Sequence, residues 1–434
     1  MRRNAVLSVL TLLTIPAVSR AQAGAAAGCA ADNAGLKLPP GFCAGIFADT
    51  LRGARHLVVA PNGDVILSLQ GRGGGLMVLR DDNKSGHADV IKKYASGFTS
   101  SEVALFDGHL YTEQGPTNGQ GEHPVAIVRY PYKPGDLAPS GPPDTIVSGL
   151  PGTPGHFTRN FVIASDGSMY VNVGSPTNSC QEKDRVSKAP GKNPCPELDT
   201  RAGIWKFDAR KKGQTEQTGV HFAKGIRNAV GITISPLDNR LWATQHGRDQ
   251  LGGQGGDWNF DDKYNSNNPA EELLQVNQGD DFGWPYCYYS VEAGKLVLAP
   301  EYGGDGKKVE QCAQKKEPVA VFPAHWAPNA LMFYTGSAFP ARYKNGAFIA
   351  FHGSWNRTGE PQAGFNVVFQ PLNGEKPSGA YEIFASGFAP NLGNGRGAGV
   401  GGHRPTGLAQ GPDGSLYVTD DAGGRIYKIV YTGK

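Results

Sequence analysis

The feature that most constrains the fold of this 434-residue chain is a hairpin pattern that occurs six times. Each copy has an apolar run, a turn built from Pro, Asp, Asn or Gly, and a second run that ends in small or polar residues. Alternating apolar runs on either side of such a turn are a strong local signal for a β-hairpin. The copies are RHLVVAPNGDVILSLQG (55–71), EVALFDGHLYTEQG (102–115), GHFTRNFVIASDGSMYVNVGS (155–175), RNAVGITISPLDNRLWATQHG (227–247), LMFYTGSAFPARYKNGAFIAFHGS (331–354) and HRPTGLAQGPDGSLYVTDD (403–421).

The spacing of the hairpins predicts the architecture. A four-stranded propeller blade needs about 40–50 residues, and longer intervals between turns are explained by loop insertions. The chain is also rich in turn formers, with 61 Gly and 31 Pro. We therefore expect an all-β, six-bladed β-propeller with four-stranded antiparallel blades, closed by the C-terminal segment GRIYKIVYTG (424–433). An irregular β-sandwich is the alternative, but sandwiches do not usually repeat one hairpin six times.

The N-terminus has the pattern of a secretory signal peptide. Arg2 and Arg3 form a basic start, residues 5–18 are apolar, and Ala21-Gln22-Ala23 is a small-x-small cleavage site. The sequence thus predicts a signal peptide over 1–23, a single propeller domain over 24–434, and a secreted, periplasmic protein. No later run of about 20 apolar residues occurs, so no membrane span is expected.

The charge balance excludes two classes of partner. Removal of Arg2, Arg3 and Arg20 with the leader lowers the 42 basic residues to 39, which equals the 39 acidic residues. A mature chain of net charge near zero gives no sign of binding to nucleic acid or to an anionic membrane.

Six cysteines follow the leader, in couples 14, 15 and 25 residues apart. Six cysteines allow fifteen pairings, and sequence alone does not choose among them. Local pairing in an oxidising compartment is the favoured interpretation, since no Cys-x-x-Cys motif suggests a metal or a covalent haem. The expected disulfides are Cys29–Cys43, Cys180–Cys195 and Cys287–Cys312.

The hairpins are expected to collect polar side chains at one mouth of the propeller channel. The first strand of a hairpin starts, and the second strand ends, at the face opposite the turn. These positions hold an excess of Arg, His and Asn, which are costly to bury without partners. An arginine-rich pocket suits an anionic partner, and a histidine beside it can act as a base near neutral pH. The positions are Arg55, Glu102, His156, Arg159, Arg227, Asn228, His403 and Arg404 at strand starts, and Gln70, Gln114, Ser175, His246, His352 and Asp420 at strand ends.

Over nearly the whole mature chain, the sequence resembles the soluble pyrroloquinoline-quinone-dependent sugar dehydrogenases, specifically their sorbosone-dehydrogenase-like branch. No single motif is specific, but their order and spacing together are. That family has a six-bladed propeller with the quinone over the channel, which agrees with the hairpin repeat. The motifs are GHFTRN, GIRNAVGITISP, ATQHGRDQLG, FGWPYCYY, FYTGSAFP, AFIAFHGSWNR and HRPTGLAQGPDGSLYVTDD.

The resemblance implies roles for matching residues. His156 is implied as the general base for the anomeric hydroxyl of a sugar, whose hydride passes to the quinone. Arg227 is implied to stabilise the charge that develops on the quinone oxygen, and Asn228 to hold the cofactor. The backbone carbonyls of Gly247 and Arg248 match a calcium-binding turn. Further candidates for cofactor contact are Arg55, Arg159, His246, His352, Arg357 and Arg404.

The sequence departs from the glucose-oxidising members at Ser175, where those enzymes have an acidic residue that supports the base. A serine orients an imidazole but does not stabilise its cation as a carboxylate does. Two other features have more ordinary interpretations. His325 is expected to pack within a loop, and the polar insertion 248–272 is either a lid or a solvated loop.

The sequence leaves two rival functions open. A calcium-dependent lactonase on a similar propeller would place acidic and Asn side chains around a metal, and a non-catalytic propeller would lack a focused charge. The favoured function is oxidation of a small-molecule sugar with pyrroloquinoline quinone and calcium. No haem motif is present, so electrons are expected to leave through an external acceptor, for which a c-type cytochrome is one candidate.

Overall fold

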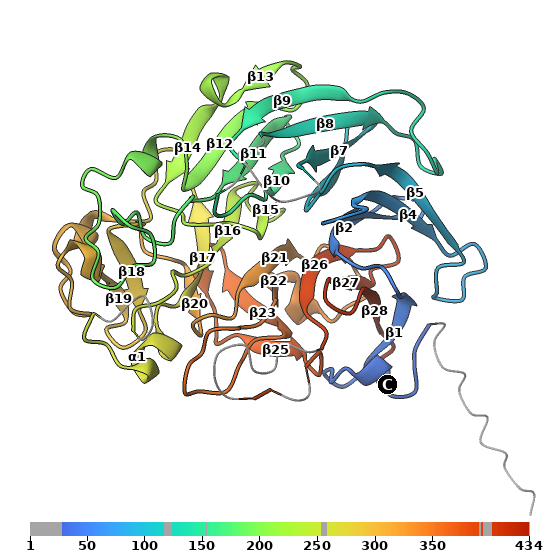
Figure 1. Ribbon diagram of the computed structural model, residues 1–434. Coiled ribbons are helices and arrows are strands. Elements are labelled where there is room, and N and C mark those ends of the chain that lie inside the picture. Colours follow the sequence, from blue (N-terminus) through green and yellow to red (C-terminus); the bar gives the residue numbers. More distant parts are fainter. Residues whose placement is uncertain are drawn as a thin grey trace, which may run out of the picture.

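The computed structural model describes residues 28–116, 124–152, 154–252, 258–389, 392–393 and 402–433. It confirms the predicted all-β fold, in which six small antiparallel sheets are arranged around a centre (Figure 1). The proposed signal peptide, residues 1–23, lies outside the described residues.

Each predicted hairpin forms the inner two strands of one sheet, and each sheet is one blade. Blade 1 is β2 (Ala54–Val59), β3 (Val65–Leu69), β4 (Gly75–Arg80) and β5 (Val90–Ser96); blade 2 is β6 (Val103–Phe106), β7 (His109–Gln114), β8 (Val125–Pro131) and β9 (Asp144–Leu150); blade 3 is β10 (Phe161–Ile163), β11 (Ser168–Val173), β12 (Gly203–Asp208) and β14 (Val220–Lys224). Blade 4 is β15 (Ile232–Ile234), β16 (Leu241–Gln245), β17 (Glu271–Val276) and β20 (Ala320–Phe322); blade 5 is β21 (Pro328–Phe333), β22 (Gly346–Phe351), β23 (Asn366–Asn373) and β25 (Glu382–Ala385); blade 6 is β26 (Pro405–Gln410), β27 (Leu416–Asp420), β28 (Arg425–Tyr431) and β1 (Phe42–Ala48).

The ring is closed by the N-terminal strand rather than by the C-terminal segment alone. β28 is the third strand of blade 6, and β1 pairs with it from Phe42 opposite Tyr431 to Ala48 opposite Ile426. The expectation for 424–433 is therefore corrected in one respect, because the outermost strand of the last blade comes from the start of the chain (Figure 1).

The blades pack through apolar layers between neighbouring sheets. Between blades 5 and 6 the layer is largely aromatic, and Phe42 meets Phe339 edge-on with ring centroids 4.8 Å apart. Such edge-to-face pairs contribute about 0.5–1.5 kcal/mol beyond the burial of their area. Because β1 carries Phe42, the same strand that closes the ring also fills this layer.

Insertions extend the simple blades. A two-stranded hairpin of β18 (Cys287–Ser290) and β19 (Lys295–Leu298) follows blade 4's third strand, and the polar insertion contains the short helix α1 (Asp262–Asn267). β13 (Gln214–Thr215) pairs with β9, and β24 (Lys376–Pro377) pairs with β23. Short 3-10 helices are Asn33–Gly35, Pro196–Asp199, Glu216–Thr218, Pro300–Tyr302, Glu310–Gln314 and Ala341–Lys344.

The three local disulfides predicted from the spacing are confirmed: Cys29–Cys43, Cys180–Cys195 and Cys287–Cys312. The first ties the N-terminal segment to β1, and the other two brace loops that extend from blades 3 and 4. Within the described ranges, no helix has the length and apolar character needed to cross a membrane.

The inner strands of all six blades line a central cavity of about 320 Å³. A buried polar network joins four blades across it. His56 Nδ1 lies 2.8 Å from Glu102 Oε2, Asn160 Nδ2 donates to the same oxygen at 3.2 Å, and His56 Nε2 lies 2.8 Å from the Asn329 carbonyl oxygen. Buried polar groups that satisfy one another in this way fix how the blades meet.

Candidate functional site

The open ends of hairpins in blades 3 and 4 meet at a small polar cavity of about 160 Å³. His156 precedes β10, whereas Arg227 precedes β15 and His246 follows β16. Antiparallel pairing brings the start of one strand beside the end of the next, which explains why these positions converge. The cavity is lined by His156, Arg185, Arg227, His246, Gly247, Asp249, Glu271, His325, Ala327, Trp355 and Asn356.

The ring of His156 is held in one orientation by Ser175. Its Nδ1 lies 2.8 Å from the Ser175 carbonyl oxygen and 3.2 Å from the Ser175 hydroxyl. Because a carbonyl can only accept, Nδ1 carries the proton and Nε2 keeps its lone pair. Burial, and then the positive charge of Arg227, hold the pKa of His156 well below its usual 6.5. His156 is thus neutral at physiological pH, with Nε2 able to accept a proton.

Arg227 is buried and tightly held. Its Nε donates to the Asn178 carbonyl at 3.1 Å, its Nη1 to the Gly247 carbonyl at 3.1 Å, and its Nη2 to Asn178 Oδ1 at 3.0 Å and to Asp249 at 3.2 Å. A guanidinium has five N–H bonds, so these contacts leave one N–H on Nη1 for a ligand. Burial lowers the pKa of Arg227 from its ordinary value, and Asp249 acts against that shift.

Asp249 is the anionic centre of the cavity wall. It accepts from Arg227, from Arg185 Nη2 at 2.9 Å and from Asn356 Nδ2 at 2.7 Å. Burial would raise the pKa of this carboxyl, but the two guanidinium groups hold it well below its usual range. Asp249 is therefore ionised and fixes the position of both arginines.

Both backbone polar groups of Gly247 are hydrogen-bonded, the N–H to Glu271 and the carbonyl to Arg227. Its N–H donates to Glu271 Oε2 at 2.9 Å, and the Ala327 N–H donates to Glu271 Oε1 at 3.0 Å. Burial raises the pKa of Glu271 to about 8. The Gly247 carbonyl accepts one hydrogen bond from Arg227, and a carbonyl oxygen has two lone pairs, so one remains for another ligand.

Two further histidines complete the wall. His246 Nε2 lies 3.1 Å from the Pro328 carbonyl, and burial followed by the charge of Arg227 lowers its pKa to about 3. His325 Nε2 lies 2.6 Å from the Asn265 carbonyl in α1. His325 was expected only to pack within a loop; it contacts the helix α1 and also lines the cavity.

Three predicted residues form a second cluster at the same mouth. Arg55 donates to Asp421 at 2.9 Å, and His352 Nε2 lies 2.8 Å from the other oxygen of that carboxylate. Arg404 donates through Nε to the His352 carbonyl at 2.9 Å. This cluster joins blades 1, 5 and 6, and its side chains do not line the cavity around His156.

The remaining predicted residues also lie outside the cavity lining. Arg159 is fully buried and donates to the His156 and Thr158 carbonyls, each at 2.8 Å. Arg357 donates to backbone carbonyls around it, including that of Ser266 in α1 at 2.7 Å. Contact of these arginines with a cofactor stays a prediction.

The last two predicted residues are engaged in similar ways. Asn228 Oδ1 accepts from Asn172 Nδ2 at 3.1 Å. The side chain of Arg248 pairs with buried Glu301, with Nη1 2.6 Å from Oε1. Its carbonyl, which the resemblance implies as a calcium ligand, belongs to the same turn as Gly247.

Sequence reasoning missed Arg185, Asp249 and Asn356. None lies on a repeated strand: Arg185 belongs to the loop between Cys180 and Cys195, Asp249 to the polar insertion, and Asn356 to the segment after β22. Asp249 and Asn356 stand within the quoted motifs ATQHGRDQLG and AFIAFHGSWNR, which was the available signal.

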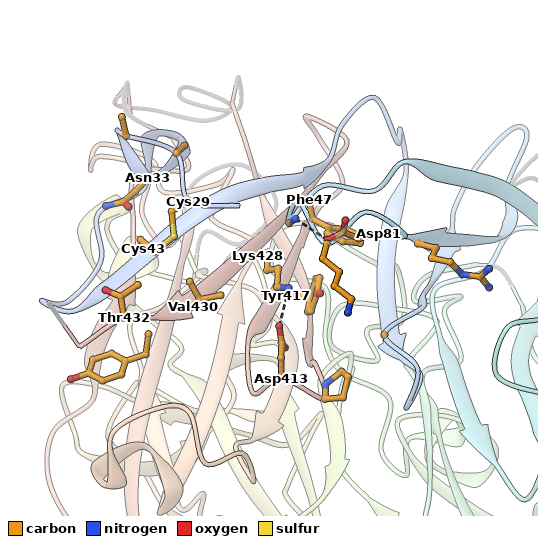
Figure 2. A pocket seen from close by; sticks show the side chains of 18 of the residues that line it. Cys29, Asn33, Cys43, Phe47, Asp81, Asp413, Tyr417, Lys428, Val430 and Thr432 are labelled. Atoms are coloured by element: carbon orange, nitrogen blue, oxygen red, sulfur yellow. Dashed lines mark hydrogen bonds and ion pairs between the residues drawn. A yellow bond between two sulfur atoms is a disulfide. The ribbon is translucent and has the colours of Figure 1, made fainter. Parts of the chain in front are cut away.

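A larger cavity of about 930 Å³ lies at the opposite face, beside the Cys29–Cys43 disulfide (Figure 2). It includes the hairpin turns at 62–63 and 412–413, so it is far from the strand ends that hold His156. Two of its cations are paired within the protein, since Lys428 contacts Asp413 at 2.9 Å and Arg80 contacts Asp64 at 2.6 Å, whereas Lys84 is exposed. We therefore place the candidate site at the polar mouth.

The model of the TrAA12-like family matches residues 36–432. The sequence is 28% identical over 418 residues to the pyrroloquinoline quinone-dependent pyranose dehydrogenase of Coprinopsis cinerea, a match that covers 84% of this chain and 51% of that protein.

Two solved structures share the fold at low identity. The holo form of the pyranose dehydrogenase PQQ domain from Coprinopsis cinerea has a TM-score of 0.71 at 21% identity, with 91% of this chain and 97% of that chain covered. A calcium structure of Trichoderma reesei carbohydrate-active enzymes family AA12 has a TM-score of 0.72 at 18% identity, with 92% and 97% covered. The chain spans about half the length of the first curated relatives it matches, with 48% and 51% of their lengths covered.

Proposed function

The chain belongs to the TrAA12-like family, and on that premise we propose that it is a pyrroloquinoline-quinone-dependent dehydrogenase that oxidises a sugar. The similarity to the pyranose dehydrogenase supports the resemblance to pyrroloquinoline-quinone-dependent sugar dehydrogenases, and the sorbosone-dehydrogenase-like branch stays a prediction. The single observation that carries the proposal is a neutral histidine beside a buried guanidinium in one cavity, because oxidation of a hydroxyl needs a proton acceptor and a group that stabilises negative charge.

The donor set of the cavity fits the quinone. The cofactor carries three carboxylates and two quinone carbonyls, which accept hydrogen bonds. Arg185 and the remaining N–H of Arg227 are donors on the cavity wall, where both guanidinium groups face the Asp249 carboxylate. When bound, the quinone would accept the hydride from C1 of the sugar.

His156 would take the proton of the anomeric hydroxyl through Nε2. Its Nδ1–H stays on the Ser175 carbonyl throughout, so the ring does not need to turn between steps. Arg227 lowers the pKa of His156 and so keeps Nε2 unprotonated, while its own remaining N–H would stabilise an oxygen that gains charge. These roles for His156 and Arg227 are part of the proposal.

Calcium is proposed at the carbonyls of Gly247 and Arg248. The free lone pair of the Gly247 oxygen fits a hard cation, and the carboxylates of the quinone would supply the negative charge. A bound calcium ion would orient and polarise the cofactor.

The arrangement of acidic groups does not favour the lactonase alternative. Within the described part of the chain, the one group of closely spaced potential ligands is Cys180, Cys195 and Glu197, and both cysteines are in a disulfide. Asp249 is already bound by two arginines. A focused cationic cavity likewise argues against a non-catalytic propeller.

Secretion to the periplasm and an external electron acceptor complete the proposal. Three disulfides support an oxidising compartment. A c-type cytochrome is the candidate acceptor.

The proposal is tested by reconstitution. Metal-stripped protein is mixed with pyrroloquinoline quinone and Ca²⁺, and reduction of an electron-accepting dye is followed with a panel of aldoses. We expect turnover only when the quinone, calcium and an aldose are all present. Turnover without the quinone, or hydrolysis of a lactone panel in its place, would contradict the proposal.

A further inference from the structure

We infer that Asn178 is a positioning residue that fixes the guanidinium of Arg227 in the wall of the cavity. This inference rests on the proposed function and adds to it the residue that holds Arg227. Asn178 belongs to the loop between β11 and β12, two residues before Cys180, whose disulfide with Cys195 lies within that loop. It is only 1% exposed and is not among the described residues that line the cavity. Its influence on a ligand must therefore pass through the residues that it contacts.

The first argument is the pair of contacts that Asn178 makes with Arg227. Two of the four hydrogen bonds of this guanidinium end on Asn178: Nε donates to its carbonyl oxygen at 3.1 Å, and Nη2 donates to its Oδ1 at 3.0 Å. Two acceptors from one residue meet two nitrogens of a planar group, so they fix both its position and its plane. The Asn178 carbonyl is itself held, because it also accepts from Trp284 Nε1 at 3.0 Å.

The second argument is the orientation of the Asn178 amide. Its Oδ1 faces two donors, since it accepts from Arg227 and from the Asp249 N–H at 2.9 Å. Its Nδ2 faces an acceptor, because it donates to the Asp249 carbonyl at 2.9 Å. An amide oxygen has two lone pairs, so Oδ1 has none left for a ligand. Asn178 thus acts through its partners, and it ties Arg227 to the turn that carries Asp249.

The third argument is the charge of the acceptors. Asn178 and Gly247 offer Arg227 neutral oxygens, and Asp249, the one carboxylate among its described partners, is shared with Arg185. A neutral amide fixes a guanidinium without cancelling its charge. That charge is what an anionic ligand, or an oxygen that gains charge, requires.

An aspartate at this position would have nearly the same shape and the opposite effect. Its second oxygen would face the Asp249 carbonyl, which can only accept, in place of the Nδ2 donor. Its negative charge would lie beside Arg227 and cancel the positive charge of the guanidinium. The inference therefore requires an amide at position 178 and not merely a side chain of that size.

The test compares Asn178→Ala and Asn178→Asp with wild-type protein and with the control Thr177→Val. The Thr177 hydroxyl donates to Glu197 at 2.7 Å and accepts from the Cys180 N–H at 2.9 Å. The control thus removes hydrogen bonds from the same loop, keeps the shape of the side chain and leaves the contacts of Arg227 in place.

Melting temperatures first establish that each variant folds. The quinone dissociation constant is then measured by absorbance titration in the presence of Ca²⁺. In a third measurement, quinone-loaded protein is mixed rapidly with D-glucose, D-xylose, D-mannose or D-galactose, and reduction of the bound quinone is followed. Rates over a range of sugar concentrations separate the maximal rate from the affinity for the sugar.

We expect Asn178→Ala to weaken quinone binding about five- to tenfold, the range of one good hydrogen bond. The maximal rate of quinone reduction should fall about 10- to 100-fold, because the donor on Arg227 is no longer held in place. The sugar concentration that gives half the maximal rate should stay within about threefold of wild type.

Asn178→Asp keeps the shape of the side chain and the acceptor for Arg227, yet it should weaken quinone binding more than Asn178→Ala does, because it adds negative charge beside the site of an anionic ligand. Thr177→Val should match wild type in quinone affinity and in the rate of reduction. A purely structural role for Asn178 predicts the reverse order, with the aspartate variant milder than the alanine variant.

Quinone affinity and a maximal rate within about twofold of wild type in both Asn178 variants would overturn the inference. Equal losses in Asn178→Ala and Thr177→Val, or tighter quinone binding by Asn178→Asp than by Asn178→Ala, would also overturn it. If Asn178→Ala does not fold, Asn178→Asp decides alone, and unchanged quinone affinity defeats the inference. A wild-type protein that binds no quinone and oxidises no aldose defeats the proposed function and this inference together, whereas an active wild type with unaltered variants defeats the inference alone.

Discussion

The Nδ1 atom of His156 lies 2.8 Å from the backbone carbonyl oxygen of Ser175, and this contact joins the two open ends of the β10–β11 hairpin. The resemblance implied that an acidic side chain is missing at position 175. The structure shows that a main-chain oxygen orients the ring instead, while burial and Arg227 keep it neutral. Orientation and charge of the proposed base are therefore controlled by different groups.

Replacement of Ser175 by alanine should have little effect on turnover. The carbonyl that holds Nδ1 belongs to the backbone and is kept in the variant, whereas the hydroxyl is farther away, at 3.2 Å, and donates to the Thr177 carbonyl at 2.6 Å. We expect kcat within about threefold of wild type, since one weak hydrogen bond is lost. Steady-state kinetics on quinone-loaded protein measures this, and a loss of a hundredfold or more would show that the hydroxyl is essential.

The pH profile should show activity that persists into mild acid. The active form of His156 is the neutral one, and its pKa in the folded protein lies well below 6.5. As pH falls, kcat/KM should remain level through 6.5 and decline only at lower pH, where the ring gains a proton. The measurement uses an uncharged aldose, so that the fall in kcat/KM at low pH reports a group of the protein and not of the substrate. A decline centred near pH 6.5 would show that the pKa of the base is not lowered and would contradict this prediction.

A buried carboxyl next to the site should make stability depend on pH. Burial raises the pKa of Glu272 from 4.5 to about 8, so between these values the folded chain holds a proton that the unfolded chain has lost. The contribution of Glu272 to the free energy of unfolding is fully present below pH 4.5 and is lost as the pH rises through 8. Glu272→Gln cannot ionise, and its free energy of unfolding relative to wild type should rise across this range.

Denaturant unfolding at several pH values checks this, with exposed Glu292→Gln as the control. A difference between Glu272→Gln and wild type that does not change with pH would contradict the assignment. Glu271 remains in the variant, and its pKa is raised in the same way. The dependence of the unfolding free energy on pH should therefore become weaker in Glu272→Gln but not disappear.

Removal of Glu102 should destabilise the ring strongly. Its carboxylate contacts His56 at 2.8 Å and Asn160 at 3.2 Å inside the channel, and both partners are buried. Leaving a buried polar network without one partner costs about 3–5 kcal/mol. Unfolding free energies of Glu102→Ala and wild type measure the effect. The matched control is Asp107→Asn, which removes the charge of the exposed pair with Arg210, suits the positive φ of this position and should cost less than about 1 kcal/mol. Equal effects would contradict a structural role for the channel network.

Much of the fold was predictable because its signals are local. In each hairpin the turn residues and the alternating apolar residues lie within about 20 residues of one another. The positions of His156 and Arg227 near the starts of strands could therefore be predicted from the sequence pattern. Ring closure was not predictable in this way, because β1 pairs with β28 from the far end of the chain. No local pattern marks such a pairing.

The site was predictable only in part, for a related reason. Arg55 and His352 share one carboxylate partner, Asp421, which was not foreseen, and their contact with a cofactor stays a prediction. Asp249 and Asn356 are 107 residues apart and meet through loops that extend from two different blades. Contacts between loops depend on how the blades are placed around the ring, and residue spacing does not contain that information.

The central claim is that the polar mouth holds the quinone within reach of His156, and one measurement tests it most directly. Quinone-loaded wild-type protein and His156→Ala are mixed rapidly with an aldose in the absence of an acceptor, and reduction of the bound quinone is followed by absorbance. The control is His109→Ala, which replaces a partly exposed histidine on β7. The account predicts equal quinone binding in all three proteins and a rate of reduction lower by about 10²–10⁴-fold in His156→Ala alone. Equal rates of reduction in His156→Ala and wild type would contradict it.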